Sequence, residues 1–237
     1  MRRTPFKLKP RTIISFSGGR TSGYMLWRVL EACDGKLPPG VVVVFCNTGK
    51  ERLETLDFVE RCSQRFEVPV VWLEYRALPS GKYRKDGKQL WQHTYAVVSY
   101  ETASRNGEPY DMAIMTRQIL PNPVMRYCTG ELKIKTTNRY VRFGLHWEEY
   151  ENAIGLRYDE PGRVAKMLAT PQAPTTFVNL FGEEQENDDG VRDTHPPGED
   201  PICPLSKARV TLDEVMGFWQ QQRGGAGVER VAGHAEG

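Results

Sequence analysis

The sequence has 237 residues, with 32 Lys and Arg against 30 Asp and Glu, and this length suits one domain with an insertion or a tail. The net charge of +2 gives no overall attraction to nucleic acids or membranes, although a local basic patch remains open. No apolar run is long enough for a membrane span or a signal peptide, and five cysteines without dense spacing do not indicate a disulfide framework. We therefore expect a cytoplasmic globular protein.

The first half of the chain alternates between the periodicities of strands and helices. A basic arm at residues 1–11 comes first, and a β-branched run at 41–46 suits a parallel strand that is buried on both faces. The expected strands are 12–16, 41–46 and 68–74, and the helices expected between them are 21–33 and 51–66. Strands that alternate with helices over short connections predict βαβ units, and hence an α/β fold with a parallel sheet.

The second half of the chain is less regular. Basic and aromatic residues are interleaved from about 76 to 110, where we predict a surface insertion over the edge of the sheet. The elements expected after it are a helix at 131–143, a strand at 153–156, a short helix at 159–168 and a last helix at 211–222. An acidic loop is expected at about 182–201 and a disordered tail at 223–237, so the main domain spans residues 12–222.

The loop that joins the first strand to the first helix has the most specific sequence. It reads Ser15-Phe-Ser-Gly-Gly-Arg-Thr-Ser22, and its paired glycines allow the backbone to approach a ligand closely. Successive backbone N–H groups, the N-terminus of the next helix and the hydroxyl groups together form a cradle for phosphate. Ligands of an open parallel sheet bind at the carboxyl ends of its strands. We therefore predict a phosphate site, and the alternative is a Gly-Gly turn that only links two elements.

Two common phosphate-binding loops do not match the sequence. The Walker pattern requires Gly five residues before a Gly-Lys pair, whereas Gly49-Lys50 has Val44 at that position and Glu51 after it. The dinucleotide fingerprint requires three spaced glycines directly after the strand, which residues 18–22 do not supply. Kinase-type and nicotinamide chemistry are therefore not supported.

A resemblance to a known family follows from five ordered blocks. Ser17-Gly-Gly-Arg-Thr-Ser22 resembles the SGGxxS loop of the PP-loop ATP pyrophosphatase superfamily. Within that superfamily, the chain resembles the phosphoadenosine phosphosulfate reductase-like family, and phage-encoded members most of all. The other blocks are Phe45–Glu51 with Glu54-Thr55, Cys128–Ile134, Ile154–Arg157 with Glu160 and Arg163, and Pro204-Leu205 before the last helix. The resemblance covers residues 12–222.

The resemblance implies a Rossmann-like parallel sheet, with helices on both faces, that binds an adenine nucleotide. The nucleotide is either ATP, with Mg²⁺ held mainly through its phosphates, or phosphoadenosine phosphosulfate. The implied nucleotide-binding residues are Ser15, Ser17, Gly18, Gly19, Arg20, Thr21, Ser22, Asn47, Thr48 and Arg163. Lys133 and Arg157 are the implied catalytic cations, because charge develops on a leaving pyrophosphate. In isolation, Lys133 and Arg157 would be interpreted as surface charges, and only the motif context favours a site.

The cysteines depart from the pattern of the sulfonucleotide reductases. Those enzymes attack sulfur with a cysteine in a C-terminal Glu-Cys-Gly-Leu-type segment, whereas this sequence has no cysteine after Cys203. Related phage members continue into a Cys-x-x-Cys pair, with which Cys128 and Cys203 would bind an iron–sulfur cluster as metal ligands. With two of four ligands here, the cluster is lost, another subunit completes it, or the chain is a shortened member. Cys33, Cys46 and Cys62 are expected in the core, and Cys128 is the expected reactive thiol.

Three functions remain open at this point. The first is cleavage of ATP between its α- and β-phosphates, which adenylates an acceptor in sulfur or nucleic-acid modification chemistry. The second is sulfonucleotide reduction with Cys128 as the nucleophile, and the partner would be thioredoxin or a sulfur-donor protein. The third is a non-catalytic module that binds a nucleotide and uses residues 82–95, with their cations and aromatic rings, to contact tRNA or DNA. The alternative for residues 82–95 is a solvated loop whose aromatic residues pack back onto the sheet.

Overall fold

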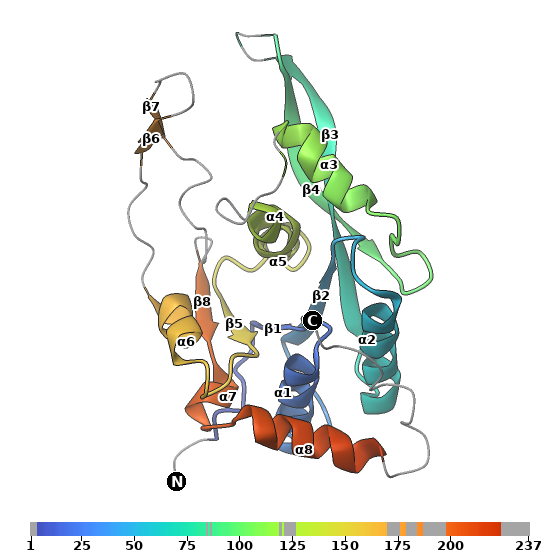
Figure 1. Cartoon of the computed structure of the whole chain (residues 1–237), viewed down its shortest axis with the longest axis vertical. Helices are drawn as coiled ribbons and strands as arrows, with labels where there is room; N and C mark the ends of the chain where they lie inside the picture. Colours follow the sequence, from blue (N-terminus) through green and yellow to red (C-terminus); the bar gives the residue numbers. More distant parts are fainter. Residues whose placement is uncertain are drawn as a thin grey trace.

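The structure is a computed structural model that describes residues 4–83, 85, 87–118, 120, 127–169, 176–178, 184–186 and 198–223. Within these residues, six strands form one sheet in the order β4-β3-β2-β1-β5-β8 (Figure 1). The strands are β1 (Thr12–Ser15), β2 (Val41–Asn47), β3 (Val70–Tyr83), β4 (Gln89–Val98), β5 (Tyr150–Ile154) and β8 (Glu199–Ile202). All neighbours pair in parallel except β3 and β4, so the predicted parallel α/β sheet is confirmed with one antiparallel edge strand.

The strand order reverses between β1 and β5. The chain runs outward from β1 through β2 to β3 and β4, and then returns to pair β5 with the other side of β1. In sheets of this kind, the crevice at the carboxyl ends of the two strands is the usual place for a ligand. The loop after β1 (residues 16–19) and the loop after β5 (residues 155–160) both begin at this point.

Helices cover both faces of the sheet, as the resemblance implies. The larger core lies beneath α1 (Arg20–Glu31), α2 (Leu53–Phe66) and α8 (Leu212–Arg223), and it includes Ile14, Phe45 and Trp72 of the strands. On the other face, Val141 of α5 (Thr136–Phe143) packs against Ile13, Val44 and Leu73. The remaining elements are α3 (Glu108–Arg117), α4 (Tyr127–Thr129), the π-helix η1 (Gly130–Lys135), α6 (Pro161–Leu168), α7 (Pro204–Lys207) and an antiparallel pair of β6 (Thr176–Val178) and β7 (Glu184–Glu186).

Residues 75–98 form a long hairpin at the edge of the sheet. The sequence predicts that the third strand ends at Glu74, but β3 continues to Tyr83 and β4 returns beside it. The position at the edge agrees with the predicted insertion, whereas its regular pairing does not follow from the sequence pattern. Tyr75 and Ala77 pack against Ala113 of α3 and Leu132 of η1. These helices, which are distant in the sequence, bury one face of the hairpin near its base.

Two parts of the predicted acidic loop are strands, since β7 lies at Glu184–Glu186 and the end of the loop belongs to β8. Residues 199–202 form β8, which pairs in parallel with β5 in the register Tyr150 to Glu199, so the expectation of a loop as far as residue 201 is wrong here. Asn152 of β5 donates to the Glu199 carboxylate at 2.6 Å. This hydrogen bond helps to hold β8 against β5, although the sequence of β8 has no alternating apolar pattern. Residues 182–183 and 187–197 of the predicted loop, and the predicted tail beyond residue 223, lie outside the described residues.

The predicted basic arm is described from residue 4 onward. Phe6 and Leu8 are buried in the larger core, so residues 4–11 pack against the domain. Among the helices of the described ranges, none is long and apolar enough to cross a membrane.

Candidate functional site

The glycine loop after β1 is closed by the hydroxyl group of Ser22. This hydroxyl accepts hydrogen bonds from the Ser17 backbone N–H at 3.2 Å and the Ser17 hydroxyl at 3.0 Å, and it donates to the Gly19 carbonyl at 2.8 Å. The Ser22 side chain is therefore fully engaged and buried. It fixes the shape of the loop that the sequence assigns to phosphate binding.

The two glycines of this loop occupy positions with different structural requirements. Gly18 has φ +75°, and a Cβ atom there would lie 2.6 Å from Cγ2 of Thr55, so neither the backbone nor the space suits another residue. Gly19 is the N-cap of α1, and no side chain caps this end of the helix. The first turn of α1 also has no acidic residue. The loop and the helix N-terminus thus form a backbone cradle suited to an anion.

Arg157 connects the loop after β5 to the first turn of α1. Its NH1 atom donates to the Thr21 hydroxyl at 3.1 Å, across the point where the strand order reverses. Asp159 and Glu160 hold the guanidinium at 2.9 Å and 3.3 Å, and the side chain is 17% exposed. The Asp159 carboxylate also accepts from the Leu212 N–H, which is the main cause of its lowered pKa. Arg157 is thus a partly buried cation in a fixed orientation beside the glycine loop.

Two other predicted residues, Arg20 and Arg163, lie on α1 and α6, the helices that follow these two loops. Arg163 pairs with Glu160 from α6, and its side chain is largely exposed. Arg20 contacts the sulfur of Met216 in α8, while its backbone carbonyl accepts from Trp219. Phosphate contacts of Arg20 and Arg163 stay predictions.

The end of β2 is anchored by Asn47. Its side-chain amide donates to Glu74 at 2.7 Å and to the Ser104 carbonyl at 2.8 Å, and its oxygen accepts from the Gly49 N–H at 3.0 Å. Asn47 and Glu74 are both fully buried, and the second oxygen of Glu74 accepts from Arg76 at 2.6 Å. The structure therefore gives Asn47 a scaffolding role, and its contact with a nucleoside stays a prediction.

A second fixed cation lies beyond the end of β2. Lys133 of η1 reaches the carboxylate of Glu51 at 3.2 Å, and Thr48 donates to the same oxygen at 3.1 Å. The Lys133 side chain is 40% exposed, and its backbone carbonyl accepts from the Cys46 thiol of β2. The structure thus joins Thr48 and Lys133, two residues that the sequence places in separate motifs, through a carboxylate that the sequence does not assign to the site.

A cluster around Glu131, which the sequence does not single out, borders the site. The Glu131 carboxylate is 3% exposed and pairs with Arg117 at 2.7 Å, Lys135 at 3.1 Å and Arg139 at 3.3 Å. Burial alone would raise the pKa of Glu131, but Lys135, Arg117 and Arg139 together lower it to about 2. The four-residue spacing from Glu131 to Lys135 to Arg139 is visible in the sequence, whereas the approach of Arg117 from α3 is not.

Ser15 belongs to a polar chain on the sheet and not to the glycine loop. Its hydroxyl donates to Asn152 at 2.7 Å, and Asn152 donates in turn to Glu199, which also accepts from Tyr150 at 3.4 Å. Burial raises the pKa of Glu199 to about 7, although the hydrogen bonds from Asn152 and Tyr150 oppose this shift. The predicted phosphate contact of Ser15 stays a prediction.

The cysteines do not form a cluster of metal ligands within the described part of the chain. Burial raises the pKa of Cys46 to about 11 and of Cys62 to about 12, and it also raises the pKa of Cys203. Cys128 is half-buried on α4, next to η1, whereas Cys203 is buried directly before α7, and these helices lie well apart in Figure 1. No group of three or more His, Cys, Asp or Glu residues suited to a metal ion occurs among the described residues.

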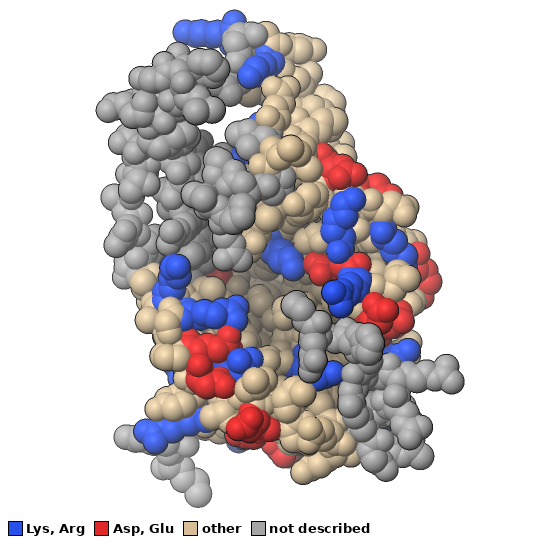
Figure 2. All heavy atoms as spheres, in the orientation of Figure 1, with Lys and Arg blue, Asp and Glu red and all other residues tan. Residues whose placement is uncertain are grey.

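The charged residues surround a hollow on one face of the molecule. In Figure 2, Lys and Arg side chains alternate with Asp and Glu side chains on both sides of this hollow. In the same orientation in Figure 1, α6 lies on one side, and α2 and α3 lie on the other.

Comparisons with known proteins find relatives of low identity. No protein-family model matches the chain. An uncharacterized nin region protein of Escherichia phage lambda, ORF290, is 27% identical over 152 residues, which cover 64% of this chain and 50% of that protein. Among solved structures, the U34-tRNA thiolase NcsA from Methanococcus maripaludis with its 4Fe-4S cluster is 17% identical, with a TM-score of 0.47, over 91% of this chain and 59% of that chain. The phosphoadenylyl-sulfate reductase from Candida auris, in a phosphate complex, is 12% identical, with a TM-score of 0.44, over 93% of this chain and 80% of that chain.

The match to a phage protein agrees with the resemblance to phage-encoded members that the sequence motifs carry. The chain spans half the length of the phage relative and 59% of the thiolase chain. Both solved structures have TM-scores below 0.5, so neither carries an inference about the reaction of this chain.

Proposed function

We propose that this chain binds an adenine nucleotide between β1 and β5 and cleaves ATP between the α- and β-phosphates, which adenylates an acceptor. The observation that carries the proposal is the bond from Arg157 to Thr21, because it holds a cation at the first turn of the helix that follows the glycine loop. Gly18 allows the left-handed turn of that loop, and the exposed Gly19 leaves its backbone accessible to phosphate oxygens. Lys133 supplies a second cation from the side of β2.

The proposed reaction uses these cations where charge develops. An acceptor oxygen attacks the α-phosphorus, the bond from that phosphorus to the bridging oxygen breaks, and pyrophosphate leaves with the electron pair. Arg157 and Lys133 stabilise the negative charge on the phosphate oxygens, and their ion pairs with Asp159, Glu160 and Glu51 orient them before the nucleotide arrives. The acceptor then carries AMP as a leaving group and is open to attack by sulfur or nitrogen.

Magnesium would enter this site with ATP. Most of its ligands would be phosphate oxygens and water, as is usual for Mg²⁺ at nucleotide sites. Glu51 is the carboxylate that already contacts both Thr48 and Lys133, so it is the side chain that we assign to the metal or to its water shell.

The products of ATP cleavage test the proposal. ATP labelled at the α-phosphate is incubated with Mg²⁺ and the chain, with total tRNA or fragmented genomic DNA as the acceptor. We expect labelled AMP or labelled acceptor together with pyrophosphate, and a rate about 100- to 1,000-fold lower for Arg157→Met, as for loss of one charge-stabilising donor. Arg65→Met, at an exposed position of α2, is the matched control. Formation of ADP and phosphate, or equal rates for wild type and Arg157→Met, would refute the assignment.

A second candidate function is sulfonucleotide reduction. It is favoured by the position of Cys128, which is half-buried on α4 directly before the π-helix that carries Lys133. In that reaction the Cys128 thiolate would attack the sulfur of phosphoadenosine phosphosulfate, and adenosine 3′,5′-bisphosphate would leave. The two thiols of reduced thioredoxin would then release sulfite from the resulting thiosulfonate and become a disulfide. A sulfite-release assay that compares wild type with Cys128→Ser and the control Cys33→Ser decides this alternative. Activity that survives Cys128→Ser excludes Cys128 as the nucleophile.

An iron–sulfur cluster does not fit the described residues. Cys203 is 1% exposed at the start of α7, and Cys128 lies on a different part of the fold. Cys128 and Cys203 therefore do not lie together as two ligands of one cluster, and neither proposed reaction uses a cluster.

A further inference from the structure

The hairpin formed by Tyr75–Val98 differs in charge from the rest of the chain. We call this segment the arm, and Figure 1 shows that it extends away from the sheet beyond α3. It contains five Lys and Arg residues and one acidic residue, whereas the remaining 213 residues contain 27 basic and 29 acidic residues. One of the five cations, Arg76, pairs with Glu74 at the base of the arm, so the excess of positive charge lies toward the tip. The arm is therefore a local basic surface on a chain that is otherwise slightly acidic.

The two faces of the arm have different environments. On one face, Tyr75 and Ala77 are buried against α3 and η1, and Trp91 packs beside them. On the other face Leu78 is 57% exposed, and toward the tip the exposed fractions are 65% for Tyr83 and 40% for Leu90. Exposed apolar groups on a protruding hairpin are unusual unless a partner covers them.

Three exposed lysines accompany these apolar groups. Lys82, Lys85 and Lys88 lie around the turn between β3 and β4, next to the exposed ring of Tyr83. A groove or arm that combines lysines with an exposed aromatic ring has the two elements that bind single strands, since cations contact phosphates and rings stack on bases. An apolar protein partner would complement the exposed leucines but not the positive charge of the three lysines. A membrane surface would require a wider apolar face than a two-stranded hairpin provides.

We propose that the arm binds a single-stranded segment of nucleic acid. The phosphates would contact Lys82, Lys85 and Lys88, and a base would stack on Tyr83. Single strands of RNA and DNA share the phosphates and bases that this surface recognises, so both are tested.

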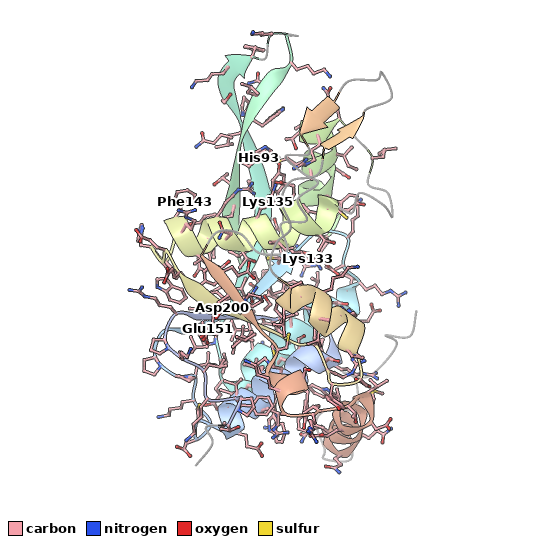
Figure 3. All side chains as sticks on the ribbon, turned by 90° about the vertical axis from the view of Figure 1, so that its left-hand side faces the viewer. His93, Lys133, Lys135, Phe143, Glu151 and Asp200 are labelled. Carbon is pink, nitrogen blue, oxygen red and sulfur yellow. The ribbon has the colours of Figure 1, made fainter. Side chains whose placement is uncertain are left out.

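The arm is connected to the candidate nucleotide site by the cluster around Glu131. His93 of β4 lies 4.0 Å from the Glu131 carboxylate, which also binds Lys135. Figure 3 shows His93, Lys135 and Lys133 in this order from the arm toward the sheet. A strand bound along the arm would thus reach the nucleotide site past basic side chains, and the nucleic acid would be the acceptor of the proposed reaction. The binding itself is independent of that reaction and is measured without ATP.

The test is an anisotropy titration of the full chain with a labelled 20-nucleotide strand. RNA, DNA and a DNA duplex of the same sequence are compared across a salt series. We expect both single strands to bind more tightly than the duplex. The triple variant Lys82→Gln, Lys85→Gln, Lys88→Gln should reduce the slope of log K against log salt by about 2, because each lost phosphate contact of a single strand contributes about 0.7.

Matched variants separate the arm from general charge effects. Lys7→Gln, Lys36→Gln and Lys207→Gln together remove the same charge from exposed positions elsewhere and should leave the slope unchanged. Tyr83→Ala should weaken binding about 5- to 150-fold through the loss of one stacked base, whereas Tyr83→Phe should retain wild-type affinity. Absence of binding at low salt, preference for the duplex, or equal losses in both triple variants would overturn the proposal. If ATP binding persists in such a case, the proposed function stands and only the arm has been misassigned.

Discussion

Replacing Glu131 by Gln removes the carboxylate that pairs with Arg117, Lys135 and Arg139. Glu131 is 3% exposed, and its oxygens lie 2.7 to 3.3 Å from the nitrogen atoms of these three side chains. At an effective dielectric constant of about 20, one such contact is worth about 5 kcal/mol before desolvation is counted. Removal of one partner from a buried ion pair costs about 3–5 kcal/mol, and the buried Glu131 carboxylate is the partner that this substitution removes. We expect Glu131→Gln to lower the free energy of unfolding by this amount at pH 7.

The pH dependence of this loss is a further check. Because the pKa of Glu131 is lowered to about 2 in the folded chain, its contribution to stability is complete above its unfolded value of 4.5 and is lost as the pH falls through 2. The difference between wild type and Glu131→Gln should therefore shrink by about 1 kcal/mol between pH 7 and pH 3.5. Urea denaturation measures both values, and Glu149→Gln at an exposed position is the control. A loss below about 1 kcal/mol at pH 7, or one equal to that of the control, would refute the role of Glu131 as the centre of the cluster.

Three other substitutions test separate parts of the site by urea denaturation. Gly18→Ala should lower the free energy of unfolding by about 2–4 kcal/mol, because the backbone there is left-handed and the added Cβ would lie 2.6 Å from Thr55. Gly35→Ala is the control, since Gly35 has the same backbone conformation in open space, and it should lower this free energy by about 1 kcal/mol. Asn47→Ala should cost about 2–4 kcal/mol through the loss of three hydrogen bonds at the end of β2. Wild type should lose about 2–3 kcal/mol between pH 5 and pH 8 as Glu199, with its pKa raised to about 7, ionises in the folded chain, whereas Glu199→Gln should lack this loss. Equal costs for the two glycine variants, no cost for Asn47→Ala, or the same pH profile for Glu199→Gln and wild type would each contradict the corresponding assignment.

The part of the fold that repeats in βαβ units is predictable from the sequence. The β-branched run that forms β2 and the glycine loop before α1 both identify elements whose local pattern agrees with their tertiary environment. The position of the glycine loop at the carboxyl end of β1 follows from the same alternation of strands and helices. These local signals suffice for the sheet and for one side of the site.

The remaining elements depend on contacts between distant segments. In the extension of β3 only Tyr75 and Ala77 are buried, by residues of α3 and η1, and the sequence of the hairpin has no apolar alternation over its whole length. β8 is short and begins with Glu199, and it is held by its pairing with β5 and by Asn152. The contact of Lys133 with Glu51 also joins η1 to the segment that leads into α2, which no local spacing indicates.

The central claim is that a nucleotide binds at the glycine loop between Arg157 and Lys133. Calorimetric titration of the chain with ATP and Mg²⁺ tests it most directly, with Lys133→Met, Arg157→Met and the exposed control Lys36→Met measured beside wild type. Saturable binding to wild type and to Lys36→Met, weakened at least about tenfold in each of the other two variants, is the predicted result, since a charge-assisted contact of this kind is worth about 1.5–3 kcal/mol. No binding to wild type, or equal affinity in all four proteins, would contradict the account.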